Sequence, residues 1–506
     1  MLTARYYLYA FASISAATFL SGAIAGGCSD AKTCYECFQA SSLCRWCAGE
    51  KSCHNIAAAT NVCEMPIARS EQCWGEACPR TIGDLGSRKI VWGLEAVAHA
   101  TDPLAKFKVY GENSTGVFRL ETGQEILGQY SAKKETSSGK VVTIGLAADW
   151  ASGTCESKVV GELMRRKNFD YTIHLGDTYY SGTLEQTKQN FFGKVPPGKN
   201  RTGVSFPNGK IGTFALPGNH EMISGGTAYY DHTLERIGMR SIPGDASSPM
   251  EGQGASYFGL ENEFWRVIGL DSGYLCYVTN EEGHRIIDLA SLNLAETNAP
   301  QPDEVIDWLK NQVKLGDPND KRGIVLLTHH HPHSIFGFDS PSPYNGTSSQ
   351  LSSIFEGSKR KILWFFGHEH ALALHKTMRF GNFEYMGRMV GNGGYSDPQL
   401  AHAADPATAI AFDNRTYQLV DGDLPVGKAS SIGFNGYASL AFEGENLTVS
   451  YFTGACKQED CKTGYSPAPA ETPMARERFT AGGNGNVSGE ITFLSPLLHI
   501  VHDEWL

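Results

Sequence analysis

The chain has 506 residues and the composition of an ordinary globular protein, with 41% hydrophobic and 19% charged residues. At about 150 residues per domain, this length predicts two to four domains. The net charge of −11 argues against a protein that coats nucleic acid, because such a protein needs a basic face to displace counterions.

Residues 1–25 have the pattern of a secretory signal peptide. A basic start precedes an apolar stretch over 6–20, and Ala23-Ile24-Ala25 is a small-residue cleavage site. A membrane anchor is the alternative, but it needs about 20 apolar residues, and this stretch is shorter and contains Ser13 and Ser15. No later segment is apolar enough for a transmembrane span. We therefore expect a protein that is secreted or held in an endomembrane or lysosome-like lumen.

Glycosylation sequences agree with that location. An Asn-x-Ser/Thr triplet begins at Asn113, Asn200, Asn345, Asn414, Asn446 and Asn486.

Nine of the thirteen cysteines lie between Cys28 and Cys78, which predicts a small disulfide-rich domain over residues 28–78. The two Cys-x-x-Cys pairs at 34–37 and 44–47 would also fit a zinc site. With Leu43-Cys44-Arg45-Trp46-Cys47 and Cys53, the spacing resembles a PSI domain, the plexin–semaphorin–integrin module. This resemblance implies four disulfides and an extracellular protein partner, without catalysis.

The next two segments have different patterns. Residues 79–138 form a linker or β segment, with candidate strands at 89–98 and 107–110. Residues 139–455 alternate between strands and helices and predict an α/β domain of two stacked sheets flanked by helices. The expected strands are 141–147, 171–175, 211–216, 264–270, 324–327, 362–366, 383–386, 437–442 and 447–452, and the expected helices are 156–167, 184–192 and 303–315.

Three further segments lack a regular pattern. We expect residues 224–254 and 276–299 to form irregular loops around the active site. Residues 456–506, rich in Gly, Pro and Ala, are expected to be a loosely ordered C-terminal extension.

Five polar clusters follow apolar runs that look like buried strands. Ligands bind at the carboxyl ends of strands in open α/β sheets, so the clusters are expected to converge on one site. Their carboxylates, imidazoles, phenols and amides suit one or two ions of zinc, manganese or iron. The clusters are Asp149-Trp150, Gly176-Asp177-Thr178-Tyr179-Tyr180, Gly218-Asn219-His220-Glu221, Thr328-His329-His330-His331 and Gly367-His368-Glu369-His370.

Individual residues in these clusters suggest roles. Two cations held about 3.5–4 Å apart need a bridging anion, and Asp177 is the candidate. A lone Gly-Asp pair is ordinarily a turn, but here Gly-Asn-His and Gly-His-x-His follow at later strand ends. His368 and His370 are two residues apart and point to the same side of an extended segment. Asn219 supplies a neutral amide oxygen.

Together the clusters resemble the calcineurin-like metallophosphoesterases and, through Gly176-Asp177-Thr178-Tyr179-Tyr180, their purple acid phosphatase branch. The resemblance covers residues 141 to 455 and implies a four-layer α/β/β/α sandwich. It implies two metal ions, iron plus zinc, manganese or a second iron. One would be held by Asp149, Asp177, Tyr180 and His370, and the other by Asp177, Asn219, His368 and a histidine after Thr328. His220 would lie near the leaving group.

The chain departs from this branch at two places. The first cluster reads Ala148-Asp149-Trp150-Ala151, where the branch has Gly-Asp-x-Gly. In the triple histidine, counting from the strand selects His329, whereas the branch's His-x-Pro pattern selects His330. We favour His329.

These observations predict a secreted, acid phosphatase-like hydrolase of phosphate monoesters that uses a metal-held hydroxide, with His220 as general acid. A phosphodiesterase or nucleotidase with the same fold is the alternative. A third hypothesis is a non-catalytic extracellular docking protein.

Overall fold

The computed structural model describes two compact units. One is Met1–Cys78 with Val195–Thr202, and the other is Pro79–Lys194 with Gly203–Leu506. The described residues are 44–47, 52–55, 66–67, 105–111, 113–127, 140–195, 203–274, 278–279, 285–286, 301–334, 345–395, 408–418, 431–454 and 472–500. The predicted signal peptide and strand 89–98 therefore lie outside the described residues, as does most of 28–78 and of loop 276–299.

In the first unit, three short strands form an antiparallel sheet in the order β2-β1-β3. They are β1 (Cys44–Cys47), β2 (Ser52–Asn55) and β3 (Pro66–Ile67), and the side chain of Cys53 is buried.

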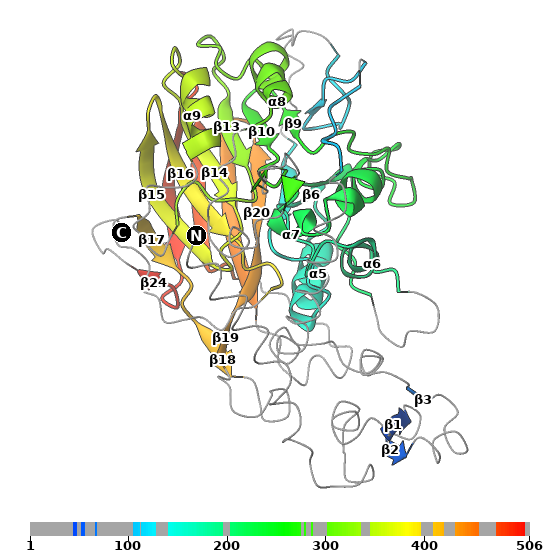
Figure 1. The fold of residues 1–506 in the computed structure, drawn as a ribbon. Helices are drawn as coiled ribbons and strands as arrows, with labels where there is room; N and C mark the ends of the chain where they lie inside the picture. Colours follow the sequence, from blue (N-terminus) through cyan, green and yellow to red (C-terminus); the bar gives the residue numbers. More distant parts are fainter. Residues whose placement is uncertain are drawn as a thin grey trace, which may run out of the picture. The chain divides into compact units, whose positions relative to one another are not determined.

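Two large sheets form the second unit (Figure 1). One has eight strands in the order β23 (Val487–Leu494), β22 (Ala475–Ala481), β21 (Asn446–Gly454), β20 (Asn435–Glu443), β5 (Val142–Ala147), β6 (Tyr171–His174), β7 (Gly212–Ala215) and β8 (Gly238–Met239). The other has nine in the order β24 (His499–Ile500), β17 (Ala409–Phe412), β15 (Leu372–Phe380), β16 (Phe383–Val390), β14 (Lys361–Phe366), β13 (Gly323–Leu327), β10 (Trp265–Gly269), β9 (Phe258–Glu261) and β4 (Val117–Arg119).

The central strands are parallel and buried on both faces. Strands β5, β6 and β7 run parallel in the first sheet, and β10, β13 and β14 run parallel in the second. Every residue of β6, β7, β10 and β13 is buried. This is the pattern expected where a parallel sheet has both faces covered, and it explains the continuous apolar runs in the sequence.

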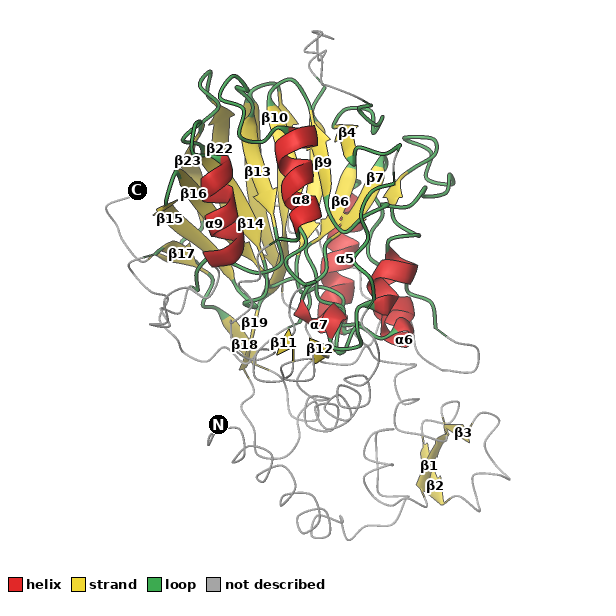
Figure 2. Cartoon of the chain, turned by 45° about the horizontal axis from the view of Figure 1, so that its top comes forward, coloured by secondary structure: helices red, strands yellow, loops and turns green. Residues whose placement is uncertain are grey.

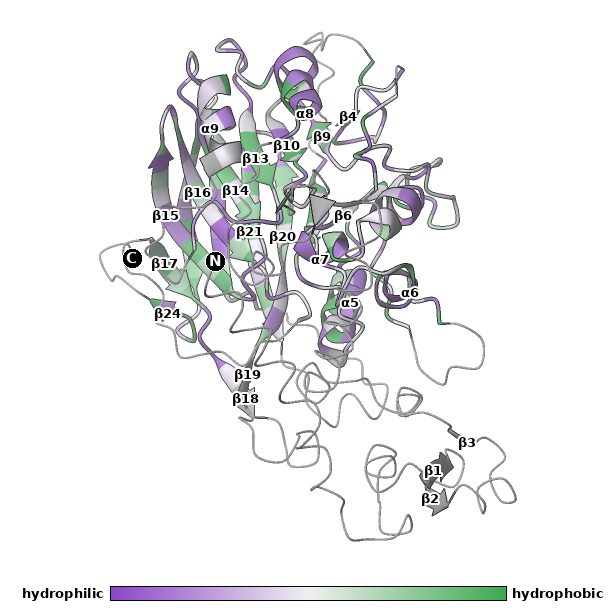
Figure 3. Ribbon diagram, viewed as in Figure 1, coloured by the Kyte–Doolittle hydropathy of each residue, from purple (hydrophilic) through white to green (hydrophobic). Residues whose placement is uncertain are grey.

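One hydrophobic core lies between the sheets and a second lies outside the nine-stranded sheet. Ile144 and Ile173 of one sheet share the first core with Val267 and Leu363 of the other. The hydropathy view shows apolar residues concentrated in the strands (Figure 3).

Helices cover the outer faces of the sheets (Figure 2). Helix α5 (Cys155–Lys167) packs on β20 and β21. Helix α8 (Asp303–Asp307), which continues as the wider turn η5 (Trp308–Val313), and α9 (Asn345–Ile354) cover the nine-stranded sheet. The predicted α/β fold, a four-layer α/β/β/α sandwich, is confirmed. Among the described residues, no helix is long and apolar enough to cross a bilayer.

The remaining elements lie near the carboxyl ends of the strands or in the connections. They are α6 (Leu184–Gln186) with η3 (Thr187–Phe191), α7 (Asn219–Met222), η4 (Tyr229–Thr233), and the hairpins β11 (Val278–Thr279) with β12 (Arg285–Ile286) and β18 (Thr416–Gln418) with β19 (Ser431–Gly433). The segment 224–254, predicted to be irregular, contains η4 and β8.

Two expectations were wrong. Residues 107–110 are not a strand, and the strand of that region is β4. The C-terminal residues 475–500 are not loosely ordered, because β22 and β23 extend one sheet and β24 pairs with β17 in the other. The reason is visible in β22, whose buried Glu477 forms a two-point ion pair with Arg388 on β16.

Candidate metal centre

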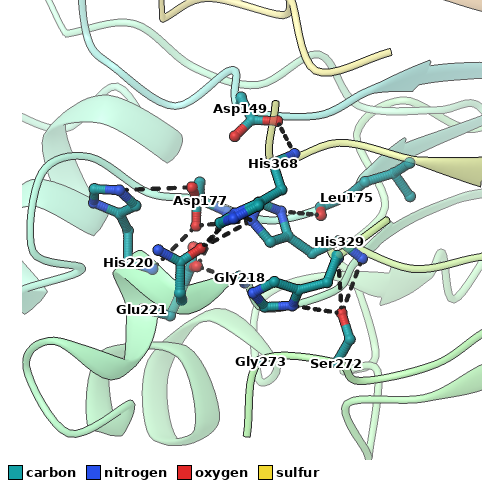
Figure 4. Close-up of polar contacts among 12 residues, drawn as sticks. Asp149, Leu175, Asp177, Gly218, His220, Glu221, Ser272, Gly273, His329 and His368 are labelled. Atoms are coloured by element: carbon teal, nitrogen blue, oxygen red, sulfur yellow. Dashed lines mark hydrogen bonds and ion pairs between the residues drawn. The ribbon is translucent and has the colours of Figure 1, made fainter. Parts of the chain in front are cut away.

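The structure brings the polar clusters together because each follows a parallel strand. Asp149 follows β5, Asp177 follows β6 and Asn219 begins α7 just after β7. His329 follows β13, and His368 and His370 follow β14. Figure 4 shows Asp149, Asp177, His329 and His368 converging from separate segments. The resulting site lies at the carboxyl ends of the central strands of both sheets.

Three of these residues have backbone angles that ordinary residues rarely adopt. The φ angles are +56° at Asp149, +73° at Asp177 and +72° at His368. Such left-handed conformations cost free energy and cluster at functional sites. At His368 the backbone N–H donates to Asp149 Oδ2 at 2.9 Å, so the surrounding contacts help to hold this conformation.

Asp177 lies between two groups of side chains. Its Oδ1 lies 3.4 Å from His329 Nε2, whereas its Oδ2 lies 3.3 Å from the hydroxyl of Tyr179. Oδ1 also accepts a hydrogen bond from the backbone N–H of His220 at 3.0 Å. Burial by itself raises the pKa of Asp177, but the imidazoles of His329 and His220 outweigh it and hold the pKa below its ordinary value. This carboxylate is therefore ionised and faces both groups.

The first group contains Asp149, Tyr179 and His370. The Tyr179 hydroxyl donates to Asp149 Oδ1 at 2.9 Å and lies 2.9 Å from His370 Nε2. His370 Nε2 is also 3.5 Å from Asp149 Oδ1. Burial, followed by the negative charges of Asp149 and Asp177, raises the pKa of Tyr179 well above its ordinary value.

The second group contains Asn219, His329 and His368. Asn219 Oδ1 lies 3.1 Å from His329 Nε2 and 3.0 Å from His368 Nδ1, and the two ring nitrogens are 3.3 Å apart. The other nitrogen of His329, Nδ1, donates to the carbonyl oxygen of Leu175 at 2.9 Å, so Nε2 is the nitrogen that faces Asn219 and Asp177. Burial lowers the pKa of His368 well below its ordinary value, so its imidazole is neutral.

This arrangement fits a cation. An amide oxygen, a carboxylate oxygen and an imidazole nitrogen face one another, and these are atoms that can bind a metal ion together. Asp149, Asp177 and His329 offer ligand atoms within 4.8 Å of one another, and so do His329, His330 and His368. A Cβ at Gly218 would lie 2.7 Å from His329 Nε2 and closer still to Asp177 Oδ1, so glycine keeps this space open.

The remaining predicted residues lie beside these groups. Tyr180 accepts a hydrogen bond through its carbonyl oxygen from His220 Nδ1, and its ring lies 4.8 Å from the His220 ring. Nε2 of His220 is 3.8 Å from Asp177 Oδ2. The phenol that contacts Asp149, Asp177 and His370 at the distances given above belongs to Tyr179, which sequence analysis did not select.

The three consecutive histidines point to different partners. His329 faces Asn219 and Asp177, as described above. His330 Nδ1 lies 3.0 Å from Ser272 Oγ, and His331 Nε2 lies 3.2 Å from Glu369 Oε1. The geometry therefore supports His329 over His330 as the histidine nearest to the other candidate ligands.

Glycines in later segments make room for Ala148, the residue before Asp149. A Cβ at Gly367 would collide with the side chain of Ala148, and a Cβ at Gly393 would collide with its carbonyl oxygen. Gly393 also donates its N–H to that oxygen at 3.0 Å. The backbone can therefore approach Ala148 closely at Gly367 and Gly393, even though residue 148 itself is not glycine.

Glu221, which lies in a predicted cluster but had no predicted role, and Ser272, which lies outside the predicted clusters, also belong to the site. Glu221 Oε2 accepts hydrogen bonds from the backbone N–H groups of Asp177 and Gly218 at 3.1 and 2.8 Å. Burial and then the charge of Asp177 raise the pKa of Glu221 to about 7. Ser272 Oγ accepts from the N–H groups of His329 and His330. The predicted strand 264–270 ends just before Ser272, and that strand end was the available signal.

Part of the chain matches a known protein family. A family model described as calcineurin-like phosphoesterase matches residues 154–372, which include every cluster except the one at Asp149. No curated protein was found to match the chain.

Several solved structures are similar to this one at low identity. The chain is 12% identical to PhoD, with a TM-score of 0.39 and coverage of 71% of this chain and 72% of that one. It is 10% identical to GAP50, described as the anchor in the inner membrane complex of Plasmodium, with a TM-score of 0.35 and coverage of 62% and 84%. A predicted phosphoesterase from Streptococcus pneumoniae is 11% identical, with a TM-score of 0.22 and coverage of 62% and 90%.

Residues 154–372 thus match the calcineurin-like phosphoesterases, a family whose members bind divalent metal ions and hydrolyse phosphate esters.

Proposed function

We propose that this protein is a secreted phosphatase with two metal ions that hydrolyses phosphate monoesters. The observation that carries the proposal is the position of Asp177, whose two carboxylate oxygens face different groups of candidate ligands. Two cations at short distance require such a shared anion to offset their repulsion.

The residues divide between two sites. Asp149, Asp177 and His370 would hold one ion, and Asp177, Asn219, His329 and His368 the other. The ions, when bound, would neutralise the phosphoryl oxygens and lower the pKa of water in the site. The resemblance to purple acid phosphatases predicts the identity of the two ions, which would be iron plus zinc, manganese or a second iron. The same resemblance predicts Tyr180 as a ligand of the ferric ion.

His220 would protonate the leaving group during in-line attack of hydroxide on phosphorus. Its Nδ1 proton is used by the carbonyl oxygen of Tyr180, so Nε2 is the nitrogen that carries the transferable proton. Nε2 lies 3.8 Å from Asp177 Oδ2. General-acid catalysis contributes about 10²–10⁴-fold.

His220→Ala tests this role through the leaving group. We expect it to reduce kcat about 10²-fold or more for an alkyl phosphate and much less for a nitrophenyl phosphate, whose leaving group needs little protonation. Equal losses on both substrates would contradict the role of His220 as general acid.

Three features support secretion. Residues 1–25 have the signal-peptide pattern, and Cys53 is disulfide-bonded, as is usual in an oxidising compartment. The sequon residues Asn113 and Asn414 have exposed side chains, as glycan attachment requires. The PSI-like segment 28–78 would then dock an extracellular protein.

The first experiment compares wild type with Asp177→Asn and with Asp231→Asn, which makes the same change on an exposed carboxylate. Phosphate release from an aryl phosphate is followed between pH 4 and 8, and iron, zinc and manganese are counted in each protein. We expect activity and metal to be lost together in Asp177→Asn alone. A metal-loaded wild type that is inert on monoesters but cleaves diesters would replace the proposal with a phosphodiesterase.

A further inference from the structure

We propose that the phenol of the first metal group belongs to Tyr179 and not to Tyr180, and that Tyr395 positions it. This inference rests on the proposed function, because it assigns a residue within the same metal centre. It replaces Tyr180, which the resemblance to purple acid phosphatases implies as the metal ligand.

The hydroxyl of Tyr179 occupies the centre of the first group. It lies 2.9 Å from Asp149 Oδ1, 2.9 Å from His370 Nε2 and 3.3 Å from Asp177 Oδ2. Tyr179 is only 3% exposed. Two candidate carboxylate ligands and one candidate imidazole ligand thus meet at a single phenol oxygen.

The backbone of Tyr179 is held on both sides. Its N–H donates to the carbonyl oxygen of Ala151 at 3.0 Å, and its carbonyl oxygen accepts from Asn190 Nδ2 at 2.6 Å. These bonds fix the direction of the Cα–Cβ bond, so the phenol has little freedom to leave the group.

Tyr395 packs against the ring of Tyr179 and is hydrogen-bonded to the backbone of Asp149. The two rings stack with centroids 4.3 Å apart and an interplanar angle of 23°. The N–H of Tyr395 donates to the carbonyl oxygen of Asp149 at 3.0 Å, and its ring lies 4.8 Å from that of His370. Tyr395 therefore acts on the group through Tyr179, as a positioning residue.

The rings of Tyr180 and Tyr179 both contact the ring of His220, the candidate general acid, with centroids 4.8 and 4.7 Å away. The ring of Tyr180 meets the His220 ring edge-on at an angle of 84°. Tyr180 is partly exposed, unlike Tyr179. This position suits contact with the leaving group.

Tyr179→Phe and Tyr180→Phe form a matched pair, since each removes one hydroxyl from adjacent residues and keeps the ring. Metal is counted in both purified full-length proteins, and each is titrated with Zn²⁺ after chelation. We expect Tyr179→Phe to lower zinc affinity by at least about tenfold and Tyr180→Phe to leave it within about twofold. If the purified wild type is purple, only Tyr179→Phe is expected to bleach it.

The reverse pattern, with loss of metal or colour in Tyr180→Phe alone, would overturn the assignment. So would unchanged metal binding in both variants. Melting temperatures of the metal-free proteins verify that both variants fold.

A double-mutant cycle tests the role of Tyr395. Tyr395→Leu removes the stacked ring and is expected to weaken zinc binding about tenfold in the wild type, but not in the Tyr179→Phe background. Tyr395→Phe, which keeps the ring, is expected to bind zinc normally. Additive losses in the double variant would refute positioning through Tyr179.

Failure of this inference differs from failure of the proposed function. A wild type that binds metal and hydrolyses phosphate esters, combined with an unaffected Tyr179→Phe, would refute only the assignment of Tyr179. A wild type that neither binds added metal nor hydrolyses any phosphate ester would refute the proposed function.

Discussion

Replacing Gly218 by alanine adds one methyl group to the space between the candidate ligands. The backbone of Gly218, at φ −104° and ψ −168°, is extended and open to any residue, so alanine causes no backbone strain. The new Cβ would lie 2.7 Å from His329 Nε2 and closer to Asp177 Oδ1, inside the 3.0 Å that real Cβ contacts respect. Asp177 or the α7 segment must move by about 1 Å to relieve these contacts.

The expected effect is large on catalysis and modest on stability. A displacement of about 1 Å in a catalytic site costs about 10²-fold in rate, or about 2.7 kcal/mol. Overpacking by one methyl group costs about 1–3 kcal/mol of folding free energy, which leaves a domain of this size folded. We therefore expect kcat/KM for an aryl phosphate to fall about 10²-fold, together with weaker Zn²⁺ binding.

The control is Gly454→Ala, whose Cβ would make ordinary contact with Leu163 Cδ1 at 3.7 Å. It is expected to retain full activity. A Gly218→Ala protein with wild-type kcat/KM and wild-type zinc affinity would refute the inference that the space beside Gly218 is part of the metal centre.

Two further predictions concern stability. Burial raises the pKa of Asp271 to about 6 from an ordinary 3.8, so its contribution to stability is present below pH 3.8 and is lost as pH rises through 6. This loss is about 3 kcal/mol, and Asp271→Asn should remove it. Urea unfolding of both proteins between pH 4 and 7 measures the difference, and parallel pH profiles would contradict the prediction. Glu477→Ala leaves the buried Arg388 without its partner and should cost about 3–5 kcal/mol. Glu490→Ala, on the exposed neighbouring strand, is the control with no expected effect, and equal stabilities of the two variants would show that the C-terminal strands are not anchored by this pair.

Much of the fold was predictable because its central strands are encoded locally. Strand β13 and helix α5 differ from their predicted bounds by only one residue at one end. Strands β9, β15 and β22 were missed, since their alternating or short apolar patterns become strands only when paired with neighbours. Strand β22 is the clearest case, because its inward carboxylate, Glu477, is compatible with a sheet only through Arg388.

The candidate site was predictable to the level of segments. Each polar cluster follows a strand, and parallel strands bring their carboxyl ends to one edge, so convergence followed from local pattern alone. Ser272 was missed because a single serine after a strand carries no distinctive chemistry. Its role appears only through hydrogen bonds to His329 and His330, more than fifty residues away.

The sequence by itself determined the class of the fold, the order of the clusters and the chemistry of their side chains, because hydrophobic periodicity and residue type are local properties. Only the tertiary structure decided which tyrosine faces Asp149 and which histidine faces Asn219. His329 is oriented by the carbonyl oxygen of Leu175, 154 residues earlier in the chain. Such directions depend on contacts between distant segments, and neither the spacing nor the composition of a single segment contains them.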